Sequence, residues 1–251
     1  MKVLGSEFRP RLAPTLITLP LVLLCLGLGA WQVQRLHWKE GLIAQRQAAS
    51  AAPPVTPPQD LADARSLEWR RVAAAGVLLN DKETLVHTIG PEGGAGFDVL
   101  TPLRQQDGSI VFIDRGFVPT ALADPALRSA GEPRGEARVV GILRLSPAAK
   151  PSWFVPDNDP PHHSWFWVDL TAIAAAGRIS DSTPYYIVAD ASPNPGGWPR
   201  GGQALPPLSN HHLQYALTWF SLAVAGVVIY VLSQRIPGDS DARTDERIPP
   251  T

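Results

Sequence analysis

Two uncharged segments decide the fold of this chain. Residues 12–34 read LAPTLITLPLVLLCLGLGAWQVQ, a run of 23 residues without a charge between Arg11 and Arg35. At a rise of about 1.5 Å per residue, a helix of this length crosses the hydrocarbon core of a bilayer. A cleaved signal peptide is the alternative, but the run is too long, and Leu28 stands where cleavage requires a small residue. We therefore predict an uncleaved transmembrane helix at 12–34.

The second segment, residues 213–232, reads LQYALTWFSLAVAGVVIYVL and also has no formal charge. It predicts a second transmembrane helix at 212–234. Two spans place residues 1–11 and 235–251 on the same side of the membrane and everything between the spans on the other. Similar numbers of basic residues flank the first span, so charge does not decide the orientation. The tail at 235–251 is polar and mixed in sign, and we expect it to be disordered.

The region between the spans divides into a connector and a domain. Residues 35–68 predict a helical extension to about residue 47, followed by an Ala/Pro linker at 48–58. In residues 69–211, short apolar runs are separated by Gly, Pro, Asn and Asp, which is typical of β-strands. The expected strands are 71–79, 83–88, 97–104, 110–118, 137–145, 164–169 and 185–190. One short helix is expected at 170–176, with Gly177 at its end.

Two local signals refine this domain. Asp107-Gly108 stands between two of the expected strands, and Asp-Gly is a strong hairpin signal, so that pair should be antiparallel. Gly116 directly follows an apolar strand, which indicates a bulge or a close approach of backbone. We therefore predict an α+β membrane protein, in which two transmembrane helices flank a β-rich, mainly antiparallel extramembrane domain.

The composition excludes several function classes. The 251 residues include 22 Lys and Arg against 23 Asp and Glu, a net charge of −1 that provides no field for binding nucleic acid. The single cysteine, Cys25, lies inside the first apolar run, so an internal disulfide or a cysteine-rich metal site is not possible.

Catalytic signatures are mostly missing, which argues against an enzyme. The sequence has no G-x-S-x-G, P-loop, H-E-x-x-H or dinucleotide-binding motif. Asp157, Asp159, His162 and His163 form the best metal-like cluster, but they lie on a proline-rich loop without a second group of ligands. We interpret that loop as structural or solvated.

The start of the second span differs from the rest of the chain. His211 and His212 place an imidazole at the membrane surface, where polar groups are costly unless they have a function. On a helix, Tyr215 and Trp219 follow His212 at i+3 and i+7 and share its face. An interfacial aromatic belt with a histidine cap is the simpler interpretation of this spacing.

The first span ends at the same level of the membrane. Trp31 and Arg35 lie there, and Arg35 is placed to meet an anionic group whose apolar body lies between the helices, as a haem propionate would.

Four fragments, in this order, resemble a known family. They read GAWQVQR at 29–35, DRGFVP at 114–119, GILR at 141–144 and NHHLQYALTWF at 210–220. The chain resembles the surfeit-locus family of cytochrome c oxidase assembly proteins over residues 29–220. The family commonly has Asn-Asn-His-Leu where this chain has Asn210-His211-His212-Leu213.

The resemblance implies an assembly factor that binds haem a at the membrane surface and assists its insertion into the largest oxidase subunit. It implies His212 as the axial ligand of the haem iron. Under this hypothesis Trp31, Tyr215 and Trp219 line the macrocycle and Arg35 meets a propionate. Other partners would be haem a synthase, further assembly factors and membrane lipid. Together with the lack of room for a mitochondrial presequence, the resemblance implies a bacterial inner membrane with a periplasmic domain.

Two other hypotheses stay open. The first is a membrane scaffold that docks oxidase intermediates without binding haem, in which case both histidines are incidental. The second is a membrane-tethered hydrolase or metalloenzyme, but the sequence shows no spacing of a nucleophile and a base that would favour it.

Overall fold

The computed structural model describes residues 2–3, 6–8, 10–203 and 209–237. The chain divides into two compact units, one formed by residues 1–43 and 208–251 and the other by residues 44–207. Each unit is described separately.

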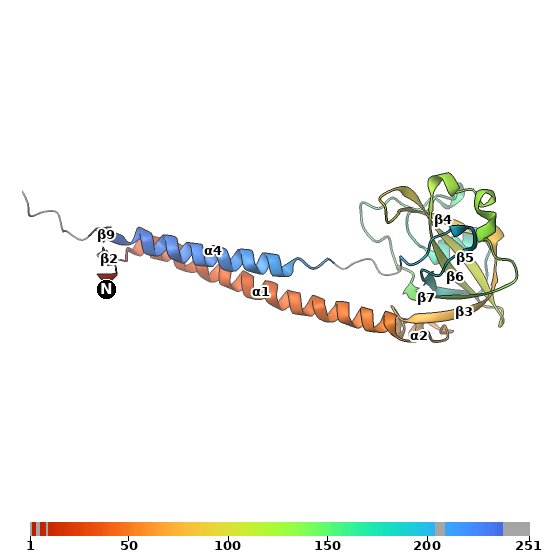
Figure 1. Ribbon diagram of the computed structural model, residues 1–251, viewed down its shortest axis with the longest axis horizontal. Helices are drawn as coiled ribbons and strands as arrows, with labels where there is room; N and C mark the ends of the chain where they lie inside the picture. Colours follow the sequence, from red (N-terminus) through yellow and green to blue (C-terminus); the bar gives the residue numbers. More distant parts are fainter. Residues whose placement is uncertain (1, 4–5, 9, 204–208, 238–251) are drawn as a thin grey trace, which may run out of the picture. The chain divides into compact units, whose positions relative to one another are not determined.

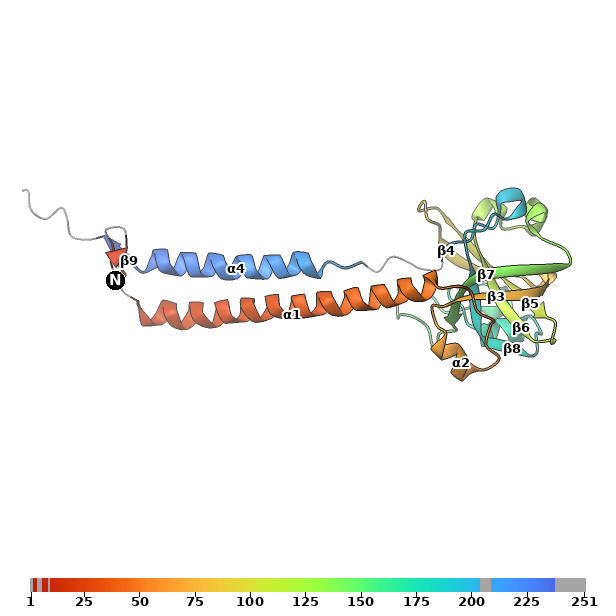
Figure 2. The ribbon, with the colours of Figure 1, turned by 60° about the horizontal axis from the view of Figure 1, so that its bottom comes forward.

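The first unit is built on two antiparallel helices (Figures 1 and 2). They are the part of α1 (Leu12–Ala51) up to residue 43, and α4 (His212–Ser233). Both helices are long and apolar enough to cross a membrane. Hydrogen bonds join α1 to α4 near both ends of the pair, between Thr15 and Tyr230 and between Gln32 and His212. The two helices predicted at 12–34 and 212–234 are therefore confirmed.

The two helices face each other along a regular seam. Residues that are buried or half-buried recur at alternating spacings of three and four, as in left-handed helix pairs. They are Thr15, Thr18, Val22, Cys25, Gly29 and Gln32 on α1, and His212, Ala216, Trp219, Ala223, Gly226 and Tyr230 on α4. Small residues allow close approach, because a Cβ on Gly29 would lie 2.6 Å from the Phe220 ring. The seam therefore sets which residues of α1 and α4 meet.

A small sheet lies next to the helix pair. It has three short antiparallel strands in the order β1 (Lys2–Val3), β2 (Ser6–Phe8) and β9 (Arg235–Pro237). The prediction of a disordered tail is thus wrong for residues 235–237, because their backbone pairs with β2. Residues 238–251 lie outside the described part of the chain.

The second unit is the β-rich domain (Figure 1). Its strands are β3 (Arg71–Leu78), β4 (Thr84–Ile89), β5 (Ala95–Gln105), β6 (Ile110–Pro119), β7 (Glu136–Leu145) and β8 (Ser182–Ala189). The sheet order is β3-β7-β8-β6-β5-β4, and a further pairing of β3 with β5 closes the first five strands into a ring. All pairs are antiparallel except β6 with β8. The predicted α+β class with a mainly antiparallel domain is confirmed.

Helices complete the domain. The α-helices are α2 (Leu61–Ser66) and α3 (Leu170–Ala176), and the 3-10 helices are η1 (Asn80–Lys82), η2 (Thr120–Leu122), η3 (Pro125–Gly131), η4 (Pro160–His162) and η5 (Pro195–Gly197). The helix predicted at 170–176 is confirmed, with Asp169 accepting a hydrogen bond from the Ala172 amide at its start.

The central strands β5, β6 and β8 are buried on both faces, which explains why they are so apolar. Along β6, Phe112 belongs to one core cluster, whereas Val111 and Ile113 belong to the other. Because side chains alternate along a strand, the two clusters occupy opposite faces of the sheet. α3 contributes Ile173 to the Phe112 cluster, and α2 contributes Ala64 to the second cluster.

Two boundary predictions are wrong. Helix α1 runs to Ala51 without a break, so the predicted linker at 48–58 begins four residues later than expected. The rest of the linker belongs to the domain, because Val55 pairs with Val72 and the Tyr185 hydroxyl donates to the Pro58 carbonyl at 2.5 Å. The domain therefore begins well before residue 69.

The strand predicted at 164–169 is also absent from the described residues of the domain. Only Ser164 and Trp165 form isolated bridges. The Asn158 side chain instead accepts from the amides of Phe166 and Trp167 at 2.8 and 3.3 Å, so it occupies backbone groups that a strand partner would use.

The two local turn signals are confirmed. Strands β5 and β6 form an antiparallel hairpin around Asp107-Gly108, and Gly108 has a φ of 89°. Gly116 has a φ of 102°, and a Cβ there would lie 2.0 Å from the carbonyl oxygen of Arg200. The close approach of backbone predicted for Gly116 is therefore present, and the β5–β6 register also shifts beside it, between the pairs Asp98–Phe117 and Leu100–Asp114.

Candidate functional site

The candidate site lies at the beginning of α4, where an imidazole faces the first helix. The Nδ1–H of His212 donates to Oε1 of Gln32, and the two atoms are 2.7 Å apart. Gln32 is only 9% exposed, and His212 is half-buried. The register of the seam brings these two side chains together although they are 180 residues apart in the chain.

This hydrogen bond determines what the imidazole can do. A neutral imidazole that donates through Nδ1 keeps its lone pair on Nε2, which is the atom that binds metal in many proteins. Metal-binding histidines are commonly held by such an acceptor on the other ring nitrogen. The donor chemistry at His212 therefore fits the iron of a haem. His211, by contrast, is exposed and stands at the N-cap position of α4.

The other predicted site residues are placed around this pair with different exposures. Trp219 is half-buried on the same side of α4 as His212, whereas Tyr215 is 55% exposed and Trp31 is 53% exposed. Arg35 is exposed, and its guanidinium carbon lies 3.9 Å from the ring centre of Trp38, one turn further along α1.

Sequence reasoning missed two residues of this region, Gln32 and Trp38. Gln32 is a polar residue inside an apolar run, and this contrast is the sequence signal that could have identified it.

The chain matches the SURF1 family over residues 19–224. It is 36% identical to "SURF1-like protein" of Monosiga brevicollis over 246 residues, which is 94% of this chain and 91% of that protein. It is 37% identical to "Surfeit locus protein 1" of Homo sapiens over 215 residues, which is 79% of this chain and 70% of that protein. The Mus musculus protein of the same name is also 37% identical, over 79% of this chain and 68% of its own length. This chain belongs to the SURF1 family.

The family assignment agrees with the resemblance found in the four sequence fragments. The relatives named above are eukaryotic, so they give no support to the bacterial type that we expected. In this SURF1 chain the first and last fragments form the facing segments of α1 and α4, whereas DRGFVP and GILR lie on β6 and β7.

A second group of ionisable residues lies inside the domain of this SURF1 protein. Burial is the largest cause that raises the pKa of Asp114 on β6, and the charge of the nearby Asp98 carboxylate on β5 is the second. Together, and against the lowering effect of the hydrogen bond from the Gly116 amide, they raise this pKa to about 8. Burial also raises the pKa of Asp98 to about 6, although a hydrogen bond with Thr88 lowers it. The signal available in the sequence was an acidic residue within each of two strongly apolar strands.

An aromatic ring between two cations adjoins this group. The Trp69 ring has the guanidinium of Arg46 at 4.0 Å and that of Arg144 at 3.9 Å from its centre. Arg144 also lowers the pKa of Asp114 through its charge. Trp69 has a φ of 72°, a conformation that is rare for a residue with a side chain. Within the domain, this contact attaches the last turns of α1 to the end of β7.

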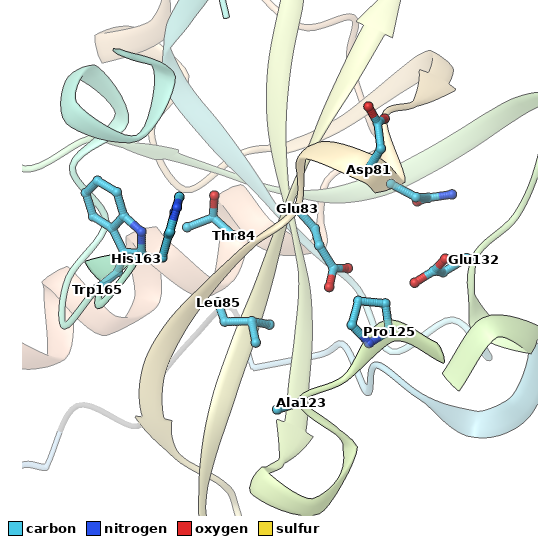
Figure 3. Close-up of a pocket in the computed structure, with 10 residues that line it drawn as sticks. Asp81, Glu83, Thr84, Leu85, Ala123, Pro125, Glu132, His163 and Trp165 are labelled. Carbon is cyan, nitrogen blue, oxygen red and sulfur yellow. The ribbon is translucent and has the colours of Figure 1, made fainter. Parts of the chain in front are cut away.

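The domain also contains an acidic pocket of about 590 Å³ (Figure 3). Glu83 in its wall is not available as a ligand, because Arg128 forms a buried ion pair with it, with Nη1 donating to Oε2 at 3.1 Å. His163 also lines this pocket.

The other members of the metal-like loop are paired with Lys150 or with each other. Asp157 accepts from Lys150 at 2.7 Å, and His162 lies 2.8 Å from Asp159. Across the described residues, no group of three or more His, Cys, Asp or Glu side chains is arranged to hold a metal ion.

Proposed function

We propose that this SURF1 protein is a cytochrome c oxidase assembly factor that binds haem a at the membrane surface and assists its insertion into the largest oxidase subunit. The observation that carries the proposal is the hydrogen bond between His212 and Gln32, because it leaves the Nε2 atom of a membrane-level imidazole ready to bind iron. Haem a is the cargo of this protein, which acts without catalysing a reaction.

The remaining residues have supporting roles in this proposal. Trp31, Tyr215 and Trp219 provide aromatic surface for the macrocycle, and the exposure of Trp31 and Tyr215 leaves their rings open to a ligand. Arg35 provides a positive charge for a propionate, and its exposed guanidinium is accessible from solvent. These residues were predicted from their positions at the ends of the two apolar segments.

We also propose a location and partners. The domain lies on the outer side of the inner membrane, the periplasm in a bacterium, and both termini lie on the inner side. Haem a synthase is the source of the cargo, and the largest oxidase subunit is the acceptor. A reporter that is active only outside the inner membrane, fused after Pro207, should be active, whereas one fused after Ser240 should be inactive. The reverse pattern contradicts this orientation.

Substitution of the two histidines tests the haem hypothesis. His212→Ala should lose most of its haem while the protein stays in the membrane, because residues 213–232 still form an apolar helix. His211→Ala is the matched control and should keep its haem, since that side chain is exposed. The measurement is the ratio of haem to protein after purification from cells that make haem a. Full retention of haem in His212→Ala, or a greater loss in His211→Ala, contradicts the assignment.

A scaffold that docks oxidase intermediates is the second candidate, and one feature of the domain favours it. Trp153 and Phe154 are 89% and 72% exposed at the tip of a turn, and exposed aromatic residues often mark protein interaction sites. Purified wild-type protein without haem, together with loss of bound oxidase intermediates in Trp153→Ser, favours the scaffold.

A further inference from the structure

The position of Gln32 points to a function beyond packing. We propose that Gln32 is a positioning residue for His212, which fixes the tautomer and ring orientation of the imidazole and tunes the electron density that Nε2 gives to the iron. This inference rests on the proposed haem function and deepens it.

The first argument is the cost of placing an amide at this point. Gln32 is 9% exposed in the seam, and the three preceding seam positions on α1 are Val22, Cys25 and Gly29. A buried amide in apolar surroundings is unfavourable unless it is hydrogen-bonded. Its carbonyl accepts from His212 at 2.7 Å, so the amide is placed where it controls one nitrogen of the ring.

The second argument is chemical. With the proton held on Nδ1, only Nε2 has a lone pair for iron, and the direction of the hydrogen bond restricts rotation of the ring. A stronger acceptor at position 32 makes the imidazole more basic and stabilises ferric over ferrous iron, which lowers the midpoint potential. Removal of the acceptor has the opposite effect.

A purely structural role is the competing explanation, since hydrogen bonds between membrane helices also hold them together. The chain offers a matched control for that role. Thr15 and Tyr230 form a hydrogen bond of 2.6 Å between the same two helices, at the other end of the pair from His212. Thr15→Val removes this bond and leaves His212 and Gln32 in place.

The experiment compares Gln32→Leu, Gln32→Glu and Thr15→Val with the wild type, as full-length chains purified with haem a and placed in lipid nanodiscs. We expect haem affinity to fall by about 10- to 100-fold in Gln32→Leu, with a higher midpoint potential for the haem that remains. Gln32→Glu keeps an acceptor, should keep its haem and should show a lower potential than the wild type. Thr15→Val should match the wild type in both measurements.

Each result supports or overturns the proposal. A wild-type potential in Gln32→Glu overturns it, and this variant decides alone if Gln32→Leu does not accumulate in the membrane. Equal loss of haem in Gln32→Leu and Thr15→Val shows that Gln32 only holds the helices together. If the wild-type protein carries no haem, the proposed function itself is refuted. That outcome is distinct from failure of the Gln32 inference, in which the wild type binds haem but the variants at position 32 do not differ as expected.

Discussion

The desolvated carboxylate of Asp114, a half-buried residue, should make the stability of the domain depend on pH. Its pKa is raised to about 8 in the folded protein, chiefly by burial and then by the charge of Asp98. In the unfolded chain the same group has its ordinary pKa of 3.8. The folded state therefore binds more protons than the unfolded state between these two values. The contribution of Asp114 to stability is therefore fully present at low pH and is lost as the pH rises toward 8.

The magnitude follows from the number of protons involved. Each additional proton held by the folded state changes the free energy of unfolding by about 1.4 kcal/mol per pH unit. Asp98 has a pKa of about 6, so it changes the free energy of unfolding mainly below pH 6. Above pH 6 the titration of Asp114 accounts for most of the change in this free energy. Over the two units between pH 6 and pH 8 the domain should lose about 2 kcal/mol of stability. Asp114→Asn removes this titration and should be more stable than the wild type near pH 8.

Urea unfolding of the full chain in detergent micelles measures this effect. Tryptophan fluorescence follows the domain, and the comparison is made near pH 6 and near pH 8. Asp157→Asn is the control, because Asp157 is an aspartate with an 88% exposed side chain and should leave the pH dependence unchanged. The same fall in stability with pH in Asp114→Asn and the wild type refutes the assignment to Asp114.

Two further predictions concern the folding of the domain. Gly116→Ala should destabilise it by about 2 to 4 kcal/mol, because alanine disfavours the positive φ at this position and its Cβ would clash with the nearby backbone. Gly108 has a similar φ but no atoms close to the position of a Cβ, so Gly108→Ala should cost only about 1 kcal/mol. Equal losses in urea unfolding would exclude the close approach as the cause. Arg128→Met should cost about 3 kcal/mol by leaving Glu83 buried without its partner, and the double variant with Glu83→Gln should recover part of that loss in a thermal melt. No recovery would argue against the ion pair.

The sequence predicted those elements whose signals are local. The uncharged runs at 12–34 and 213–232 predict α1 and α4 because few other structures accommodate about 20 apolar residues. Asp107-Gly108 predicts its hairpin because the turn itself requires such residues. The helix at 170–176 is predicted by periodicity and by its end at Gly177, and α3 has the same bounds.

Features that depend on distant contacts were not predictable in this way. The parallel pairing of β6 with β8 and the closure of β3 onto β5 join strands that are far apart in sequence, and no local signal specifies such partners. The run 164–169 has the alternation of a strand, but the amides of Phe166 and Trp167 donate to the Asn158 side chain instead of to a neighbouring strand. Linker residues such as Val55 enter the domain by pairing with β3, which their Ala/Pro composition does not indicate.

The site shows the same division between local and distant information. A histidine at the start of α4 was noticed because an imidazole at the start of an apolar helix is unusual in itself, and the family resemblance implied His212 rather than His211. Gln32 was not predicted, since its role depends on the register of α1 against α4. That register is set by small residues, with Gly29 against Phe220 and a Cβ at Gly226 only 3.3 Å from Val22. Packing of apolar surfaces thus brings the amide to the imidazole, and the polar pair that carries the proposed chemistry depends on the seam around it.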